Sequence, residues 1–441
     1  MDILFVVPYV PSLVRTRSYN LVRHLSARGH RVSVATVWSN ERERAEVDEL
    51  KACCDEVHAV HVPVWRSLLN CVRALPSSEP LQAVYSWSRA LASQIISLQR
   101  KADVLHVEHL RGARYGSYVK TRPESADIPV VWDAVDCISY LFQQAIATRR
   151  DRIGALVNRL ELPRTRRREG SLLRHFDRVL ISSEVDKEAM VGLGRALPHP
   201  LAPGACERLV TVLPNGVDTS YFTPSNEPRR PKTLVFSGKM SYHANVSAAM
   251  HLVGSIMPLI WARQPDVRLV IVGQDPPPKL RAVAARHASL VTVTGTVPDI
   301  RPFLRQASVA VIPLVYGAGS QFKVLEAMAC ATPVVATPRS VVALAARAGH
   351  DILVAEHARA FADAVIELLE SPPKREAIGR AGRAYVEAHH HWGRIAAQLE
   401  TIYADVVTQY RGVQPPSDRG STGAEDSLCA SPSAYTSPLV P

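Results

Sequence analysis

The chain has 441 residues, which is long enough for two domains with sizeable cores. Hydrophobic residues make up 47% of it and charged residues 21%, as is ordinary for a globular protein. The net charge of +11 indicates an anionic partner, which could be nucleic acid, a membrane surface or a phosphorylated substrate. Aromatic residues are only 6%, and no zinc finger or basic strand interleaved with aromatics is present, which argues against nucleic acid.

The N-terminal stretch MDILFVVPYVP lacks the basic flank and small-residue cleavage site of a signal peptide, and we interpret it as a first strand. No apolar run looks long enough to cross a bilayer. The seven cysteines are scattered, without metal-ligand or disulfide spacing, which favours a reducing compartment. We therefore expect a cytoplasmic protein.

The first elements have a βαβ pattern: a strand over Asp2–Val7, a helix from about Tyr19 to Arg28, and a second strand in HRVSVATV. This opening is typical of a doubly wound sheet, in which ligands bind at the carboxyl ends of the strands. Arg15 and Arg17 stand in the first such loop. They are candidates for contact with a phosphate or another ligand, and the alternative is a solvated basic loop.

A further strand is predicted over Asp103–Val107, and Glu108, His109 and Arg111 follow its end. A histidine at a strand's carboxyl end and next to a carboxylate could polarise a hydroxyl group or orient a bound ligand. The alternative is an ordinary loop histidine. The next strand and loop, PVVWDAVDCIS, end with Asp133 and Asp136, which we interpret as hydrogen-bond acceptors that orient the loop; Asp136 is a candidate acceptor contact.

From Arg149 to Arg178 many arginines alternate with leucines, which predicts a basic amphipathic helix broken at Pro163. Such a face could lie on an anionic bilayer or could simply be a solvated outer helix.

The second half opens with a strand over Thr233–Gly238, followed by Lys239 and a helix from about Asn245. A strand that ends in small residues before a helix is suited to an anion. VRLVIVGQD is the next predicted strand.

The stretch from Val309 to Ala336 has the pattern strand, glycine turn, helix, strand, and Ser320 is a good N-cap for its helix. Lys323 in the first turn is unfavourable with the helix dipole, and a phosphate bound there would reverse that effect. Glu326 shares a face with Lys323 and could accept hydrogen bonds from ribose hydroxyls. The alternative is a solvated Lys/Glu pair on a crossover helix.

The run GxxxKVLEAMAxxxPVV, together with PNGVD at Pro214–Asp218 and FSGKMSYHAN at Phe236–Asn245, resembles the large family 4 of retaining glycosyltransferases with the GT-B fold. The nearest likeness is to bacterial sugar transferases of exopolysaccharide systems, and it extends to about Tyr410. The resemblance implies an α/β architecture of two Rossmann-like doubly wound domains that face a cleft.

The resemblance also implies roles for residues. Lys239 and Lys323 would contact the donor's diphosphate, and Glu326 its ribose. The implied catalytic residues are Lys323, Glu326, Lys239, His109 and Glu108. The implied donor-binding residues are Gly238, Lys239, Gly273, Gln274, Thr296, Val297, Gly319, Ser320, Gln321, Lys323, Val324 and Glu326. The implied acceptor-binding residues are Arg15, Arg17, His109 and Asp136.

Two residues depart from the family pattern. Ala318 stands where the family usually has a glutamate that contacts the transferred sugar. Ala331 stands at the usual glycine of the helix C-terminus, and because a left-handed alanine costs about 1 kcal/mol, we expect this helix to end differently.

The predicted organisation has five parts. They are an acceptor domain over residues 1–195, a linker over 196–232, a nucleotide-sugar domain over 233–385, a closing helix over 386–413 that packs back on the first domain, and a disordered tail over 414–441.

The resemblance predicts transfer of a sugar from a nucleoside diphosphate sugar, with UDP or GDP as the favoured nucleotide, and with retention. It implies no cofactor and no bound metal. The acceptor would be a glycan, lipid-linked or small molecule in polysaccharide or glycoconjugate synthesis, with peripheral contact to the inner face of the plasma membrane. The alternatives are a natural-product glycosyltransferase, a nucleotide-sugar epimerase and a non-catalytic binding protein.

Overall fold

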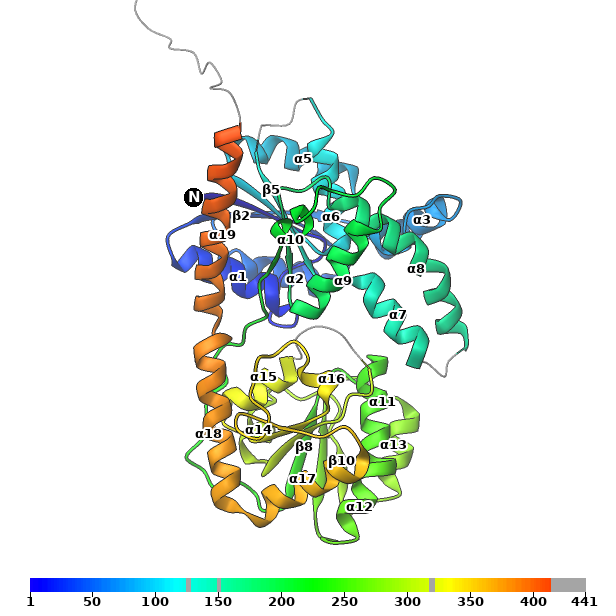
Figure 1. The fold of residues 1–441 in the computed structure, drawn as a ribbon, viewed down its shortest axis with the longest axis vertical. Coiled ribbons are helices and arrows are strands. Elements are labelled where there is room, and N and C mark those ends of the chain that lie inside the picture. Colours follow the sequence, from blue (N-terminus) through cyan, green and yellow to red (C-terminus); the bar gives the residue numbers. More distant parts are fainter. Residues whose placement is uncertain (124–127, 149–151, 317–321, 414–441) are drawn as a thin grey trace, which may run out of the picture.

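A computed structural model describes residues 1–123, 128–148, 152–316 and 322–413. They form two parallel sheets with helices on both faces, one sheet in each half of the chain (Figure 1). The first sheet has the strand order β3-β2-β1-β4-β5-β6-β7 and the second β10-β9-β8-β11-β12-β13. The doubly wound GT-B architecture predicted from the sequence is confirmed.

The strands of the first sheet are β1 (Asp2–Val7), β2 (Arg31–Trp38), β3 (Glu56–His61), β4 (Val104–Glu108), β5 (Val130–Val135), β6 (Arg178–Ile181) and β7 (Val210–Val212). Its helices are α1 (Thr16–Ala27), α2 (Glu41–Leu50), α3 (Val64–Ala74), α4 (Leu81–Tyr85), α5 (Arg89–Leu98), η1 (Gln99–Lys101), α6 (His109–Lys120), α7 (Ile138–Thr148), α8 (Arg152–Leu172), α9 (Glu184–Arg195) and α10 (Ala205–Leu209).

The strands of the second sheet are β8 (Thr233–Ser237), β9 (Arg268–Val272), β10 (Val291–Val293), β11 (Val309–Ile312), β12 (Val334–Ala336) and β13 (Leu353–Val354). The helices of this half are α11 (His243–His251), η2 (Leu252–Ile256), α12 (Met257–Trp261), α13 (Pro278–Ala285), α14 (Arg301–Gln306), α15 (Phe322–Ala329), α16 (Pro338–Val341), α17 (Ala358–Glu370), α18 (Pro372–His389) and α19 (Trp392–Val413).

The strand order decides where ligands can bind. In each sheet the chain reverses direction across the sheet beside its first strand, between β1 and β4 and between β8 and β11. Crevices in doubly wound sheets open outside the carboxyl ends of the strands at such points. The loops that follow β1, β4, β8 and β11 are therefore the places to look for a site.

The first strand shows why its sequence forms a central strand. Ile3, Phe5 and Val7 pack in the cluster beneath α1 and α19, while Leu4 and Val6 pack on the opposite face with α5 and α6. Because side chains alternate along a strand, an unbroken apolar run is buried on both faces.

The two halves are joined through the turn that contains Asn215 and Gly216. His390, between α18 and α19, accepts a hydrogen bond at its carbonyl from Val217 N (2.7 Å), and its Nδ1 lies 2.8 Å from Asn215 O. A Cβ on Gly216 would lie 2.6 Å from the Trp392 ring, so only glycine fits there. Figure 1 shows α18 beside the second half and α19 beside the first.

Two expectations about elements need correction. The first helix begins at Thr16, so Arg17 lies in α1 rather than in the loop. The predicted linker over 196–232 contains β7, which pairs with β6, so the first sheet continues past residue 195. Residues 414–441, predicted to be disordered, lie outside the described residues.

The basic helix is not broken at Pro163, because α8 continues through it. Contacts on both sides of the proline hold α8 in place: Glu161 accepts a hydrogen bond from Leu81 N (2.7 Å), and Glu169 accepts two from the first turn of α7. Tertiary contacts therefore outweigh the lost backbone hydrogen bond.

One helical stretch of the described residues, His243–Trp261, is long and apolar enough to cross a membrane by length and composition. The sequence expectation of no such run was wrong on that measure. Leu252, Val253 and Ile256 of this stretch pack in the core of the second half, which accounts for its apolar character.

Ala331 adopts a left-handed conformation (φ 52°), so the expectation that α15 ends differently was wrong. Thr332 N donates to Ala327 O and Ala331 N to Met328 O, both at 2.9 Å, which is the Schellman pattern. Arg229 donates to the carbonyls of Cys330 and Ala331 and so satisfies this helix end further.

Candidate functional site

The carboxyl end of the second sheet brings Lys323 and Gly238 together. Lys323 lies in the first turn of α15, and a Cβ on Gly238 would be 3.3 Å from its Cε. Burial lowers the pKa of Lys323 to about 8, while the nearby Glu326 raises it. The cation thus lies at a helix start beside the loop after β8, where a bound anion would favour its charged form.

Glu326 follows one turn later on the same face of α15. Burial raises its pKa to about 7, and Lys323 opposes that rise. A partly buried cation and carboxylate with pKa values displaced toward each other are typical of functional sites. Residues Ala318, Gly319, Ser320 and Gln321 lie outside the described residues.

Two glycines shape the loops around this pair. Gly238 and Gly273 have φ values of 153° and 154°, and a Cβ on Gly273 would lie 1.8 Å from Gly238 O. Met240 N donates to Gln274 O at 2.9 Å, which joins the loops after β8 and β9. The lack of a side chain at Gly273 therefore lets the two loops pack directly against each other beside Lys323.

The other predicted donor residues are less closely gathered. Lys239 is exposed, and its carbonyl accepts a hydrogen bond from Asn245 Nδ2 (2.9 Å). Val324 is fully buried in the core, so only its backbone could reach a ligand. Exposed Thr296 and half-buried Val297 follow β10, the edge strand of the sheet.

A pair of aromatic side chains that was not predicted from the sequence lies at the same end of the second sheet. Tyr316, after β11, places its hydroxyl 2.7 Å from His243 Nδ1, and the two rings stack with centroids 5.4 Å apart. His243 is the first residue of α11. The one sequence feature that could have indicated this pair is that Tyr316 follows a predicted strand and His243 precedes a predicted helix.

At the carboxyl end of the first sheet, Tyr9 and Glu108 meet. The Tyr9 hydroxyl donates to Glu108 Oε1 at 2.7 Å, and Glu108 is only 2% exposed. Burial, followed by the charge of Asp133, raises the pKa of Glu108 to about 7. This carboxyl can therefore gain or lose a proton near neutral pH, as a general base or acid must.

His109, the first residue of α6, has a left-handed backbone conformation (φ 63°). Val135, the last residue of the neighbouring strand β5, is also left-handed (φ 67°). Left-handed backbone is costly for such residues and gathers at functional sites. Burial, and then Arg111, lower the pKa of His109 to about 4, so its imidazole is neutral at pH 7.

The two arginines of the first loop have different surroundings. Arg15 pairs with Glu43 (2.6 Å) and stacks on the Tyr9 ring. Arg17 is 4% exposed and donates five hydrogen bonds, two to Asp133 and three to the turn Leu213–Asn215. With every N–H engaged, Arg17 has no donor left for an acceptor, and the predicted acceptor contact is replaced by a structural role.

Asp136 lies in the loop before α7 and accepts a hydrogen bond from Ser182 Oγ at 3.0 Å. Burial, and then Asp186, raise its pKa to about 6. It lies at the carboxyl end of β5, one strand beyond Glu108.

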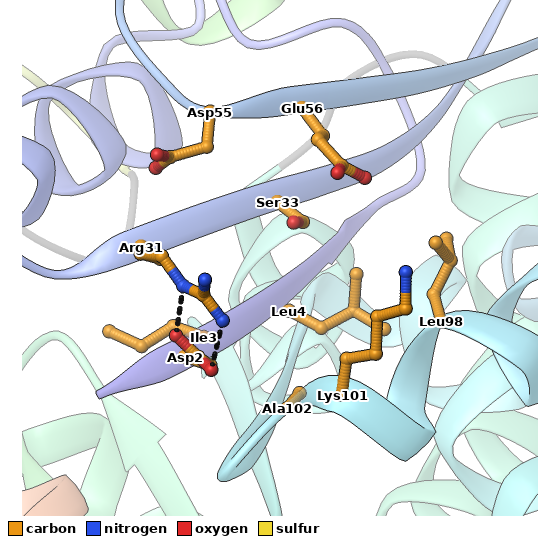
Figure 2. Close-up of a pocket in the computed structure, with 10 residues that line it drawn as sticks. All are labelled: Asp2, Ile3, Leu4, Arg31, Ser33, Asp55, Glu56, Leu98, Lys101 and Ala102. Carbon is orange, nitrogen blue, oxygen red and sulfur yellow. Dashed lines mark hydrogen bonds and ion pairs between the residues drawn. The ribbon is translucent and has the colours of Figure 1, made fainter.

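A cavity of about 270 Å³ lies at the opposite edge of the first sheet (Figure 2). Figure 2 shows Arg31 facing Asp2, with Lys101 and Glu56 nearby. It opens at the amino ends of β1 and β2, where parallel sheets do not hold their ligands. We therefore assign the site to the carboxyl ends.

Two family models match the chain. The one described as "Glycosyl transferase 4-like domain" matches residues 14–203, and the one described as "Glycosyl transferases group 1" matches residues 231–371. Phosphatidyl-myo-inositol mannosyltransferase of Mycobacterium tuberculosis is 31% identical over 214 residues, which are 46% of this chain and 56% of the relative. D-inositol 3-phosphate glycosyltransferase of Stackebrandtia nassauensis is 28% identical, over 56% of this chain and 58% of the relative.

The chain thus spans about half the length of the curated relatives it matches. Solved structures with the same fold include HepE of Anabaena in complex with UDP, with a TM-score of 0.64 and 14% identity, covering 92% of this chain and all of that one. Sucrose-phosphate synthase of Thermosynechococcus elongatus gives a TM-score of 0.62 and 17% identity, over 93% and 100%. With both halves matched by these family models, the chain belongs to the group 1 glycosyltransferases of the GT-B fold.

Proposed function

We propose that this protein transfers a sugar from a nucleoside diphosphate sugar to an acceptor held by the first half of the chain, with retention of the anomeric configuration. The observation that carries the donor side is the buried Lys323–Glu326 face beside Gly238 at the switch point of the second sheet. Retention rests on the family resemblance.

In the proposed reaction the bond between the anomeric carbon and the diphosphate breaks, and a bond to the acceptor oxygen forms. In this proposal Lys323 and Lys239 offset the charge that develops on the departing diphosphate, and Glu326 accepts hydrogen bonds from the ribose. Such electrostatic stabilisation is commonly the largest contribution to catalysis. Because Lys323 is largely desolvated, its attraction to the diphosphate is stronger than it would be in water.

On the acceptor side, Glu108 is the residue suited to take the proton that the acceptor hydroxyl loses. Its pKa of about 7 makes it a competent base at neutral pH, and Tyr9 fixes its orientation. Neutral His109 beside it can donate one hydrogen bond and accept another. The left-handed backbone holds this imidazole at the strand end.

We place the activity in polysaccharide or glycoconjugate synthesis in the cytoplasm. The two curated relatives act, by their names, on phosphatidyl-myo-inositol and on D-inositol 3-phosphate. The described cysteines are all free, which fits a reducing compartment.

Peripheral contact with an anionic membrane is part of the proposal. Leu156, Val157 and Leu160 of α8 are each at least half exposed, and so are Trp65 and Leu68 of α3. Arg164 Nη2 of α8 donates to the carbonyl of Leu75 at the end of α3 (2.8 Å), so the two helices adjoin. Exposed apolar side chains next to arginines suit an anionic bilayer surface. If the protein co-sedimented equally with neutral and anionic vesicles, the proposed membrane contact would be refuted.

The first experiment is a thermal-shift and hydrolysis screen of the purified protein against UDP-, GDP-, ADP- and TDP-sugars, with free UDP and GDP as controls. A ligand at about a hundredfold its dissociation constant adds nearly 3 kcal/mol of stability. We expect a shift with one base and slow release of its diphosphate. No shift with any nucleotide would refute the donor site.

The same screen separates the rival functions. A nucleotide-sugar epimerase would convert its donor without an acceptor. A non-catalytic relative would give a thermal shift but no turnover with any acceptor.

A further inference from the structure

Arg111 is a half-buried cation in the first turn of α6, three residues after Glu108. Its Nε is buried and has no hydrogen-bond partner, and among the described residues its guanidinium forms no ion pair. It stacks over the Tyr85 ring at 5.1 Å. Buried polar groups normally find partners, so this one needs an explanation.

Other buried guanidinium groups of the described chain show what is missing. Arg17 directs all five N–H groups to oxygen atoms, and Arg229 donates to carbonyls at the ends of both α14 and α15. Arg111 has the same need for acceptors, and burial lowers its pKa. An anion from outside the protein would satisfy it.

Arg111 lines a small cavity of about 60 Å³ at the carboxyl ends of β1 and β2. Tyr9, Arg15, Glu43 and Tyr85 also line it. Because Arg15 and Glu43 pair with each other at 2.6 Å, their charges cancel and that of Arg111 is left over. The volume is about that of two water molecules, which suits the head of a small anion.

We propose that the acceptor carries a phosphate group and that Arg111 binds it in this cavity. The inference rests on the proposed function and names the acceptor's chemical class. Tyr9 lines the cavity and also bonds Glu108, so a phosphate held by Arg111 leaves the rest of the acceptor next to the proposed base. No acidic residue lies in the first turn of α6 to oppose an anion.

The direct test is calorimetric titration with inorganic phosphate of the full chain carrying Lys323→Ala, which removes most phosphate binding at the donor site. Adding Arg111→Gln should weaken the remaining binding at least about tenfold, because a charge-assisted hydrogen-bonding partner is lost. Arg114→Gln is the matched control. Arg114 lies one turn along α6 and stacks on Trp87 at 4.8 Å, but it lines other cavities, so this change should have no effect.

If the Arg111→Gln and Arg114→Gln variants bound phosphate with equal affinity, the proposal would be overturned. Arg111→Lys guards against misfolding, because it keeps the charge and should bind phosphate with intermediate affinity. Donor binding is measured separately by the nucleotide thermal shift. If no nucleotide shifted the melting temperature but Arg111 still bound phosphate, only the donor site would be refuted. If a nucleotide shifted the melting temperature but Arg111 did not contribute to phosphate binding, only the phosphate site would be refuted.

Transfer assays then distinguish the two sources of the phosphate. A soluble polyol and its phosphate monoester form one pair of acceptors, and vesicles of phosphatidylcholine with and without phosphatidylinositol form the other. A preference for the monoester identifies a free phosphorylated acceptor, and a preference for the phosphatidylinositol vesicles identifies a lipid headgroup. In either case Arg111→Gln should raise KM for the phosphorylated acceptor more than it lowers kcat. No preference in either pair would contradict the proposal.

Discussion

Arg17 and Asp133 form a two-pronged ion pair, with Nε to Oδ2 at 2.8 Å and Nη2 to Oδ1 at 3.1 Å, although 116 positions separate them in the chain. Both side chains are almost completely buried, and the remaining N–H groups of Arg17 bond the turn that leads into the second half. The pair thus connects α1, β5 and the start of the interdomain turn.

Arg17→Met should destabilise the protein by about 3–5 kcal/mol, because it leaves Asp133 buried without its partner. Urea unfolding measures this. Arg31→Met is the matched control: Arg31 makes the same two-pronged pair with Asp2 but is mostly exposed, so its loss should destabilise the protein far less. A loss of stability at Arg31 as large as that at Arg17 would contradict a structural role specific to Arg17.

Lys323→Ala should reduce turnover by about 100- to 1000-fold, because a preorganised cation at the diphosphate is removed. Steady-state kinetics with the donor found in the screen measures it. Lys374→Ala removes a more exposed cation from α18 and should leave turnover unchanged. Near-normal turnover of the Lys323 variant would refute the diphosphate assignment.

Donor affinity should be highest between about pH 7 and pH 8. Burial raises the pKa of Glu326 to about 7, so below that range its carboxylate takes up a proton and accepts fewer hydrogen bonds. Burial lowers the pKa of Lys323 to about 8, so above that range the lysine loses its positive charge. Titration with a nucleotide sugar at several pH values tests this. Glu326→Gln should remove the acid limb and keep the alkaline limb; an unchanged acid limb would assign it to another group.

Gly273→Ala should destabilise the protein by at least about 2 kcal/mol and weaken donor binding, since its Cβ would lie 1.8 Å from Gly238 O. Thermal unfolding with and without nucleotide separates the two effects. Gly254→Ala is the control, because no atom lies within 4 Å of the added Cβ. If the change at Gly273 left both properties intact, the backbone packing of the two loops would not shape the site.

Ala331→Gly should stabilise the protein by about 1 kcal/mol, because glycine adopts the left-handed conformation without steric cost. Urea unfolding gives the difference. Ala329→Gly, two residues earlier within α15, should act in the opposite direction by a similar amount, because glycine is unfavourable inside a helix. Equal effects at the two positions would mean that the cap stores no strain.

Local spacing was sufficient to predict the central strands and the shared face of Lys323 and Glu326, whereas it placed the start of the first helix too late. These features depend on side chains a few residues apart, where helix and strand periodicity fixes direction. The strand run that became β8 and the glycines that follow β8 and β9 likewise indicated where an anion could approach.

The sequence alone determined the alternating α/β plan, because that plan depends on periodicity within single elements. The division into two domains and the proposed donor face came from the family resemblance of short local motifs. The tertiary structure decided the partners: Arg17 with Asp133, Tyr9 with Glu108 at 99 positions, and His243 with Tyr316 at 73. It also left Arg111 without an anion in the described chain. Which distant side chains meet, and which cation stays unpaired, depends on how strands order in the sheet and helices pack on it, and no local pattern contains that information.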